Sequence, residues 1–372
     1  MTWDLVCARR LERHRLATPA SADRLADVVG AMCGAHAQVM SAAEVSVGIR
    51  VAGVTRTQVR QALWVDRTLV KTRGPRGTVH LLPAADLPMW TGALSALPAP
   101  AYESALLKPD QVDEVVAAVG GALADAELTR QELTAAVVAG TGPWAGDKVV
   151  EMFGGEKWPR WTAAMAAASQ RGAMCFGPER GRQTTYTSPA RWLPGFRPMD
   201  TDAALSALVQ RYLHGYGPAQ PAHFAKWLAI SPKWAERLFA SLDLERVDGG
   251  WVNAGDADLP DAPAGGVRLL PYFDAYGVGC HPRELVFPGR AGTRALARGQ
   301  AGNFPVLLVG GTVAGVWHQR RAGRRIHVTV EAFGTLSAAR RRALQEQVER
   351  VGEILEGTPS LTLGEVTAGP HA

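Results

Sequence analysis

His36 and Gln38 lie two positions apart in the sequence His36-Ala37-Gln38, between the expected end of one helix and the start of the next. An imidazole, with an unperturbed pKa near ~6.5, can accept a proton close to neutral pH. A carboxamide cannot take that proton, but it can accept a hydrogen bond from a water molecule and orient it. In a helical turn or a bend the two side chains can converge on one water, and a bend is expected here. The alternative interpretation is structural: His36 caps the first helix and Gln38 binds a nearby backbone carbonyl.

The elements around this pair form the first copy of a pattern that occurs three times along the chain, in which short helices precede a hairpin. Helical spacing of apolar residues and a capping box at Ser41-x-x-Glu44 predict helices over residues 22–34, 42–51 and 57–65. Strands over 69–71 and 78–82 follow, joined by a loop over 73–77 that is rich in glycine. This arrangement is typical of a winged helix, in which the hairpin loop is the wing.

The second and third copies follow the same pattern. In the second, a helix begins near Pro109, Thr129 caps the next helix, a third helix covers 158–171, and the wing covers 172–188. In the third, helices are predicted over 203–216, 221–228 and 231–242. A tight hairpin then joins strands over 244–247 and 251–253, because an Asp-Gly pair between apolar runs is a good turn signal.

After Ala254 the sequence changes to short β-rich runs bounded by glycine and proline. Strands are predicted over 267–271, 285–288, 306–309, 312–319 and 326–333, and they indicate a small antiparallel β-barrel. A closing helix over 337–355 carries an apolar stripe made by Leu344, Val348, Val351 and Leu355. The predicted fold class is α+β, with three tandem winged helix-turn-helix units followed by the barrel. The expected domains are residues 1–100, 101–198, 199–256 and 257–372.

The charge of the chain is unevenly distributed. The 40 Lys and Arg against 35 Asp and Glu leave a net charge of +5, which by itself says little about a partner. Residues 290–350, however, contain eleven arginines and only three acidic residues. A local excess of that size suits a polyanion; the alternative is an ordinary solvated basic surface. The densest part is a predicted hairpin over 318–327, whose two arms present four arginines beside two histidines.

Several other classes of protein are not indicated. The four cysteines lie far apart without a Cys-x-x-Cys pair, which argues against a disulfide framework or structural zinc and favours a reducing compartment. The first residues do not resemble a secretion signal, and no apolar run approaches the ~20 residues that span a bilayer. A cytoplasmic protein is therefore expected. Because no Gly-x-x-x-x-Gly-Lys-Ser/Thr loop and no cluster of metal ligands is present, neither a cofactor nor a metal is expected.

Five short stretches carry a resemblance to a known family. They are residues 34–38 (Gly-Ala-His-Ala-Gln), 76–81 (Arg-Gly-Thr-Val-His-Leu), 216–219 (Tyr-Gly-Pro-Ala), 270–276 (Leu-Pro-Tyr-Phe-Asp-Ala-Tyr) and 313–317 (Val-Ala-Gly-Val-Trp). Each is weak alone, but five in the family order are fairly specific. With them, the sequence resembles the bacterial winged-helix DNA glycosylase family of AlkZ and YcaQ over about residues 20–350.

The resemblance implies a C-shaped protein that acts on double-stranded DNA and hydrolyses the N-glycosidic bond of N7-alkylated purines. Some members of the family resolve interstrand crosslinks, and some protect antibiotic producers from their own DNA-alkylating product. The family's catalytic motif, Gln-x-Gln or Gln-x-Asp, falls on His36-Ala37-Gln38, nearest to the AlkZ-like branch. Because this sequence carries His first, His36 is expected either as the general base or as a group that positions the water, with Gln38 as the second water ligand.

The same resemblance makes a set of basic and polar residues candidates for DNA contacts. On the hairpin, placed to clamp phosphates or to enter a groove beside the lesion, they are His318, Arg320, Arg321, Arg324 and Arg325. On the first wing, Arg73 and Arg76 would reach phosphates. Thr78 and His80 follow on one face of the next strand because side chains alternate along a strand. His80 is expected to face either the lesion or solvent.

A second class of function is compatible with the sequence, namely a non-enzymatic winged-helix DNA-binding protein or transcriptional regulator, because a fold alone does not establish chemistry. Regulators of this type usually dimerise, whereas three units plus a barrel in one chain argue for a monomer on asymmetric DNA. Either function places the protein on the nucleoid. The sequence does not determine the preferred adduct, the unhooking of crosslinks or the flipping of the damaged base.

Overall fold

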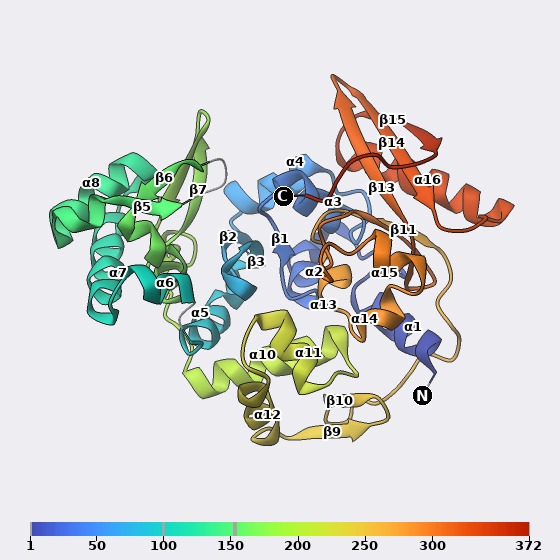
Figure 1. Cartoon of the computed structure of the whole chain (residues 1–372), viewed down its shortest axis with the longest axis horizontal. Coiled ribbons are helices and arrows are strands. Elements are labelled where there is room, and N and C mark those ends of the chain that lie inside the picture. Colours follow the sequence, from blue (N-terminus) through green and yellow to red (C-terminus); the bar gives the residue numbers. More distant parts are fainter. Residues whose placement is uncertain (1, 99–100, 152–154, 372) are drawn as a thin grey trace. The chain divides into compact units, whose positions relative to one another are not determined.

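The structure is a computed structural model that describes residues 2–98, 101–151 and 155–371. The chain divides into two compact units, whose elements are labelled in Figure 1. The central unit, named for its place in the middle of the sequence, is Leu63–Leu208. The discontinuous unit combines Met1–Ala62 with Val209–Ala372. The four domains expected from the sequence are a finer division and stay a prediction. Within the described residues, no helix is both long enough and apolar enough to cross a membrane.

The central unit begins with the first predicted hairpin. β2 (Leu69–Arg73) pairs antiparallel with β3 (Val79–Pro83). The strands are connected through the 3-10 turn Pro75–Gly77, in which Arg76 and Gly77 have left-handed φ angles of 59° and 67°. Both predicted strands are confirmed, with small shifts at their ends.

Four helices follow this hairpin in the chain: α5 (Leu87–Ser95), α6 (Ala101–Leu106), α7 (Pro109–Leu123) and α8 (Arg130–Thr141). The predicted cap of α8 is confirmed. The Thr129 hydroxyl accepts a hydrogen bond from the Glu132 backbone N–H at 3.3 Å, and the Glu132 carboxylate accepts one from the Thr129 backbone N–H at 2.7 Å. These reciprocal bonds satisfy N–H groups that the start of a helix leaves without an intrahelical partner.

The second predicted wing is also present as a hairpin. β7 (Cys175–Arg180) and β8 (Gln183–Thr187) pair antiparallel, and β4 (Glu127–Thr129) pairs with the other edge of β8. A further two-stranded sheet is formed by β5 (Lys148–Glu151) and β6 (Lys157–Pro159).

The helix predicted over 158–171 is wrong in its first half. The chain there forms the end of β6, then the 3-10 turn Arg160–Ala164 and only then α9 (Met165–Gln170). Pro159 explains the difference, because a proline disfavours a helical backbone in the preceding residue and donates no hydrogen bond. The apolar side chains of this stretch still serve the core, where Trp161 is completely buried.

The discontinuous unit starts with α1 (Trp3–Arg13), α2 (Leu25–Ala31), α3 (Met40–Gly48) and α4 (Arg56–Trp64). The capping box predicted at Ser41 and Glu44 is wrong, because Ser41 lies inside α3 and Val39 occupies the N-cap position. Glu44 is completely buried, and its carboxylate pairs with the guanidinium groups of Arg60 at 2.6 Å and Arg56 at 3.4 Å. With these partners, the carboxylate is directed to α4 and not to the start of its own helix.

The helices and hairpin predicted for the third copy are confirmed. They are α10 (Thr201–Tyr216), α11 (Pro221–Leu228), α12 (Pro232–Ala240), β9 (Leu244–Val247) and β10 (Gly250–Asn253). Aromatic rings join α10 to α11: the Tyr212 ring centroid lies 5.1 Å from that of Phe224 and 5.0 Å from that of Trp227. These three rings are buried and pack α10 against α11.

A curled half-barrel sheet with the strand order β11-β12-β13-β14-β15 follows in the same unit (Figure 1). Its strands are β11 (Val267–Leu270), β12 (Val306–Val309), β13 (Thr312–Ala322), β14 (Arg325–Ala332) and β15 (Thr358–Leu363). The first four pair antiparallel, whereas β15, which has no predicted counterpart, runs parallel to β14. The expected antiparallel barrel is therefore met only in part.

Three short helices lie between β11 and β12: α13 (Ala275–Gly279), α14 (Arg283–Val286) and α15 (Arg290–Arg294). The strand predicted over 285–288 is therefore wrong. A short apolar run does not by itself distinguish a strand from a helix, and Leu285 in this run is 43% exposed.

The closing helix α16 (Ala338–Ile354) is confirmed together with its cap and its apolar stripe. The Ser337 hydroxyl accepts a hydrogen bond from the Arg340 backbone N–H at 3.3 Å. All four predicted stripe residues, Leu344, Val348, Val351 and Leu355, are buried. The sequence periodicity thus identified the face of α16 that packs on the unit.

His14, which follows α1, is buried among aromatic rings of the discontinuous unit. Its ring centroid lies 4.7 Å from that of Tyr216 and 5.5 Å from that of Tyr276, edge-on in both cases. Burial, together with the nearby positive charge of Arg50, lowers the pKa of His14 to about 3. The imidazole is therefore neutral in the folded protein near neutral pH.

Replacing His14 by phenylalanine should make the stability of the protein less sensitive to acid. The unfolded chain binds a proton at this histidine near pH ~6.5, whereas the folded chain does not until about pH 3. The contribution of neutral His14 to the free energy of unfolding is therefore complete above the unfolded pKa. As the pH is lowered from that value to about 3, this contribution decreases by at most ~1.4 kcal/mol per pH unit. Urea denaturation at about pH 7 and about pH 5 measures the difference.

The control for this experiment is His327→Phe, which removes a half-buried imidazole on the hairpin. An equal acid-induced loss of stability in His14→Phe and in the wild type would contradict a buried, neutral His14.

Candidate functional site

The His36-Ala37-Gln38 motif lies between α2 and α3 of the discontinuous unit. After α2 the chain turns through Cys33 and Gly34, whose φ angles of 58° and 96° are left-handed, and continues as the short strand β1 (Ala35–His36). A bend at residues 38–39 follows before α3, as the sequence predicts. His36 is only 9% exposed, whereas Gln38 is exposed. The motif therefore presents a sheltered imidazole and a solvated carboxamide next to a bend.

Phe273 packs directly against the imidazole of His36. The two ring centroids are 4.5 Å apart and the ring planes are inclined by 34°. The backbone at Phe273 is left-handed, with φ of 54°, and its N–H donates to the carbonyl of Gly302 at 2.9 Å. A Cβ on Gly302 would lie 2.8 Å from Cδ1 of Phe273, so only glycine leaves room for the ring in this position.

Asp274, the next residue, forms a buried bidentate ion pair with Arg50 at the end of α3. Nη2 of Arg50 donates to Oδ1 at 2.7 Å and Nη1 donates to Oδ2 at 2.8 Å. The carboxylate also accepts hydrogen bonds from the Ser46 hydroxyl at 2.6 Å and from the Tyr276 backbone N–H at 3.0 Å. Burial opposes ionisation, but the charge of Arg50 and these hydrogen bonds hold the pKa of Asp274 below its ordinary value.

This ion pair connects α3, which follows the motif directly, to the segment that carries Phe273. Arg283, which is nearer to Asp274 in the sequence than Arg50 is, does not pair with it. The guanidinium of Arg283 donates instead to the carbonyls of Gly277 and Val278. Asp274 thus has a structural position beside the site.

The basic hairpin predicted over 318–327 is formed by β13 and β14. Ala322 pairs with Arg325, so the turn is at residues 323–324. Across the hairpin, His318 lies opposite Thr329 and Arg320 lies opposite His327. Because directly opposed residues share a face and side chains alternate, these four residues and Arg325 form one polar face of the hairpin.

The opposite face of the hairpin is apolar and contains Arg321. Trp317, Ile326 and Val328 on this face are buried. Arg321 lies opposite Ile326, and its Nη1 donates to the carbonyl of Leu355 at the end of α16 at 2.8 Å. The four arginines are therefore not equivalent, since Arg321 is tied to the fold.

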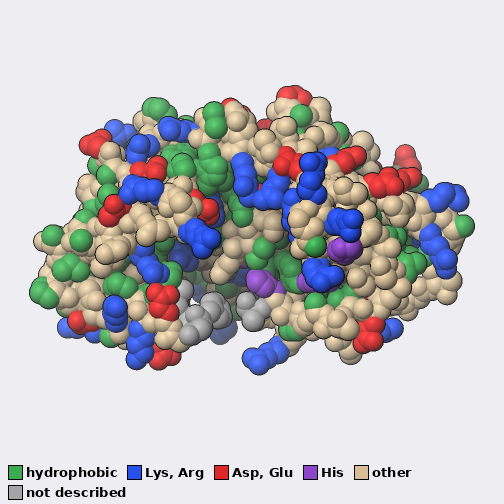
Figure 2. Space-filling model, turned by 90° about the horizontal axis from the view of Figure 1, so that it is seen from above, with side chains coloured by type: hydrophobic (Ala, Val, Ile, Leu, Met, Phe, Trp, Pro, Cys, Tyr) green, Lys and Arg blue, Asp and Glu red, His purple; other side chains and the backbone are tan. Residues whose placement is uncertain are grey.

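The side chains of Arg320, Arg324 and Arg325 are exposed and form no hydrogen bond or ion pair within the described residues. On the face drawn in Figure 2, histidine side chains lie among lysine and arginine side chains. Exposed cations that no carboxylate neutralises are the groups that can bind a polyanion.

Other arginines of the basic region 290–350 have structural partners. Nη2 of Arg350 lies within hydrogen-bond distance of the backbone carbonyls of Gly48, Val51 and Val54, at 2.9, 3.0 and 2.7 Å. Arg290 pairs with Glu331 at 2.7 Å, and Arg294 pairs with the same carboxylate at 3.0 Å. Counting arginines in the sequence therefore overestimates the charge available to a partner.

The candidate residues of the first wing lie in the central unit, whereas His36 and Gln38 lie in the discontinuous unit. Nη1 of Arg73 donates to the Gly77 carbonyl at 2.9 Å, and the Thr78 hydroxyl donates to the Pro75 carbonyl at 3.1 Å. These bonds order the loop that presents Arg76. The expectation that His80 faces solvent is wrong, because His80 is 4% exposed, and its Nδ1 lies 2.9 Å from the carbonyl of Thr78.

Residues near His36 that the sequence reasoning did not single out are Phe273, Tyr272 and His371. Tyr272 is adjacent to Phe273, and its hydroxyl lies 3.5 Å from Nδ1 of His318. The available signal was the motif over 270–276, which served only to identify the family. A search of the described residues finds no group of three or more histidine, cysteine, aspartate or glutamate side chains that could hold a metal ion.

Comparison with known proteins confirms the resemblance found in the sequence. The sequence model of the family described as DNA glycosylase AlkZ-like matches residues 29–354. A relative from Streptomyces sahachiroi, named "Interstrand DNA cross-link repair glycosylase", is 32% identical over 336 residues, which cover 85% of this chain and 87% of the relative. The solved structure of Streptomyces sahachiroi DNA glycosylase AlkZ matches with a TM-score of 0.79 and 28% identity, over 98% of this chain and 100% of that chain.

These matches, together with the mixed α+β fold, identify the chain as a DNA glycosylase, an enzyme that removes bases from DNA. Within this class, the chain belongs to the AlkZ-like family of DNA glycosylases.

Removing one partner of the Arg50–Asp274 pair should destabilise the protein strongly. Arg50→Met leaves an uncompensated buried carboxylate, which costs about 3–5 kcal/mol of unfolding free energy. Breaking the exposed pair of Arg24 and Asp27, whose side chains are 59% and 63% exposed, by Arg24→Ala should cost less than ~1 kcal/mol. Urea denaturation compares the two variants. If Arg50→Met lost no more stability than Arg24→Ala, the buried pair would not be the constraint that its geometry indicates.

Proposed function

We propose that this glycosylase hydrolyses the N-glycosidic bond of N7-alkylated purines in duplex DNA, including bulky adducts and interstrand crosslinks. The observation that carries the proposal is the motif itself: His36 and Gln38 lie directly before and at a bend, inside the matched residues 29–354. The name of the Streptomyces sahachiroi relative, a crosslink repair glycosylase, supports the substrate class. In an organism that makes a DNA-alkylating product, the same reaction would provide self-resistance.

The chemistry requires little acid catalysis. An N7-alkylated purine carries a positive charge, and the electron pair of the breaking C1′–N9 bond neutralises it as the base departs. The enzyme has to hold a water molecule against C1′ and stabilise the cationic sugar. In the proposed mechanism the water oxygen bonds to C1′, His36 accepts its proton or orients it, and Gln38 accepts a hydrogen bond from the same water. None of these steps requires a metal.

The DNA would be held by surfaces in both compact units. The polar face of the β13–β14 hairpin, with His318, Arg320 and Arg325, and the turn residue Arg324 would contact phosphates or enter a groove. In the central unit, Arg73, Arg76, Thr78 and His80 belong to the candidate wing. We further propose that the three helix-and-hairpin segments are winged-helix units and that the protein acts as a monomer on asymmetric DNA.

Substituting either motif residue should abolish most of the chemistry without abolishing binding. His36→Ala and Gln38→Ala should each lower the single-turnover rate of base release by roughly 100-fold, the range expected for loss of a positioned acid–base or water-binding group. Affinity for DNA should stay within about 3-fold, because neither side chain supplies phosphate binding. The measurement is release of N7-methylguanine, or of a bulkier N7 adduct, from labelled duplex in the presence of a chelator.

The matched control is Ser41→Ala, a nearby substitution in α3 outside the motif, which should leave the rate unchanged. Full activity in both motif variants would show that the site is assigned wrongly. Sequence-selective binding by the wild type without any base release would favour the regulator instead.

Removing the exposed hairpin arginines should weaken DNA binding and reduce its dependence on salt. The triple variant Arg320→Ala, Arg324→Ala, Arg325→Ala should lower the slope of log K against log salt concentration by up to ~3, about one for each phosphate that an arginine no longer neutralises. Fluorescence anisotropy with a labelled duplex at several salt concentrations measures this slope. Arg321→Ala is the matched control, since Arg321 is bound to the Leu355 carbonyl. A slope unchanged in the triple variant would exclude the hairpin as a phosphate-binding surface.

A further inference from the structure

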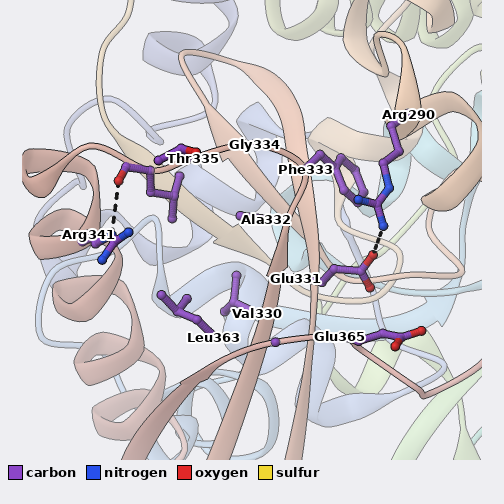
Figure 3. A pocket seen from close by; sticks show the side chains of 12 residues that line it. Arg290, Val330, Glu331, Ala332, Phe333, Gly334, Thr335, Arg341, Leu363 and Glu365 are labelled. Atoms are coloured by element: carbon purple, nitrogen blue, oxygen red, sulfur yellow. Dashed lines mark hydrogen bonds and ion pairs between the residues drawn. The ribbon is translucent and has the colours of Figure 1, made fainter.

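The segment that follows β15, residues 364–371, is anchored to the half-barrel at Val366. The Val366 backbone N–H donates to Oε2 of Glu331 at 3.1 Å, and its carbonyl accepts a hydrogen bond from Nη2 of Arg294 at 2.6 Å. Glu331 is 7% exposed and also pairs with Arg290. Figure 3 shows the Glu331 side chain directed toward Arg290 at the edge of a cavity of about 700 Å³. The charged groups here satisfy one another, so the network anchors the segment rather than forming an open binding site.

At its other end, the segment places His371 beside the aromatic residues of the candidate site. The His371 backbone N–H donates to the carbonyl of Asn303 at 2.9 Å. The His371 ring centroid lies 5.2 Å from that of Tyr272 and 5.5 Å from that of Phe273, edge-on to the latter. Residue 371 lies outside the residues 29–354 that match the family model.

The rings form a continuous series that ends at the catalytic motif. His371 contacts Phe273, and Phe273 contacts His36 at a centroid distance of 4.5 Å. Tyr272, Phe273 and His371 are half-buried and therefore keep some contact with solvent. A half-buried ring on a fixed backbone can still change its rotamer unless neighbouring side chains prevent it. His371 is the neighbour that contacts both Tyr272 and Phe273.

We propose that His371 is a positioning residue for the glycosylase reaction: it holds the rings of Tyr272 and Phe273, and through Phe273 it fixes the imidazole of His36. The expected effect of His371 on the rate of base release rests on the proposed function, whereas its expected effect on the His36 ring does not. The distinction allows the two proposals to fail separately.

The first arm of the test observes His36 in the protein without DNA. The measurement is NMR of the protein with isotope-labelled histidine. The chain has nine histidines, and His36→Gln identifies the signal of His36 by its loss. His371→Ala should shift the His36 ring signal and change its titration midpoint, because the environment of the imidazole has changed. His371→Phe, which retains an aromatic ring, should restore both. Thr367→Ala, at an exposed position of the same segment, should change neither.

The second arm measures single-turnover base release and DNA affinity. His371→Ala should lower the rate about 10-fold, as expected for a misplaced catalytic group, with the dissociation constant for DNA within about 2-fold of the wild type. His371→Phe should restore most of the rate. An unchanged His36 signal and an unchanged rate in His371→Ala would overturn the positioning role. A shifted signal in a protein that releases no base would retain the positioning role and reject the proposed function.

Discussion

The buried ion pair between Arg50 and Asp274 is the constraint on which the site depends. Two charges taken out of water are costly unless their hydrogen-bonding groups are satisfied. Here the bidentate contact is supplemented by the Ser46 hydroxyl and the Tyr276 N–H, and both partners are at most 3% exposed. The pair spans 224 positions of the sequence. The pair holds α3, the helix that follows the His36 motif, against Asp274. Phe273, the residue directly before Asp274, packs on the His36 ring.

Around this constraint, the structure separates the residues that maintain the fold from those available to a partner. Strand alternation places Arg320 and Arg325 on the polar face of the hairpin and turns Arg321 toward α16. Arg350 and Arg294 similarly bind backbone carbonyls. A basic sequence region is thus divided, side chain by side chain, between stabilising the discontinuous unit and presenting charge to solvent. A glycosylase needs both, since a rigid platform reduces the cost of aligning a water with the sugar.

Elements with a strong local signal were predictable from the sequence. The α16 stripe, the Thr129 cap and the hairpins with tight turns all depend on residues close to one another in the chain, and the structure confirms them. The errors occurred where a distant contact or a proline decided the outcome. Glu44 fits a capping box locally, but it is buried against two arginines of the next helix. The apolar run over 285–288 fits a strand locally, but it forms the end of a short helix.

The sequence by itself determined the periodicity of its helices and strands, the family motifs and the bend before α3, because each of these depends on neighbouring residues. Only the tertiary structure decided that Asp274 pairs with Arg50 and not with Arg283, that Phe273 and His371 reach the vicinity of His36, and that one hairpin arginine is structural. The physical reason is that many arginines in the chain could satisfy one carboxylate. The choice among them depends on which side chains folding brings together and removes from water.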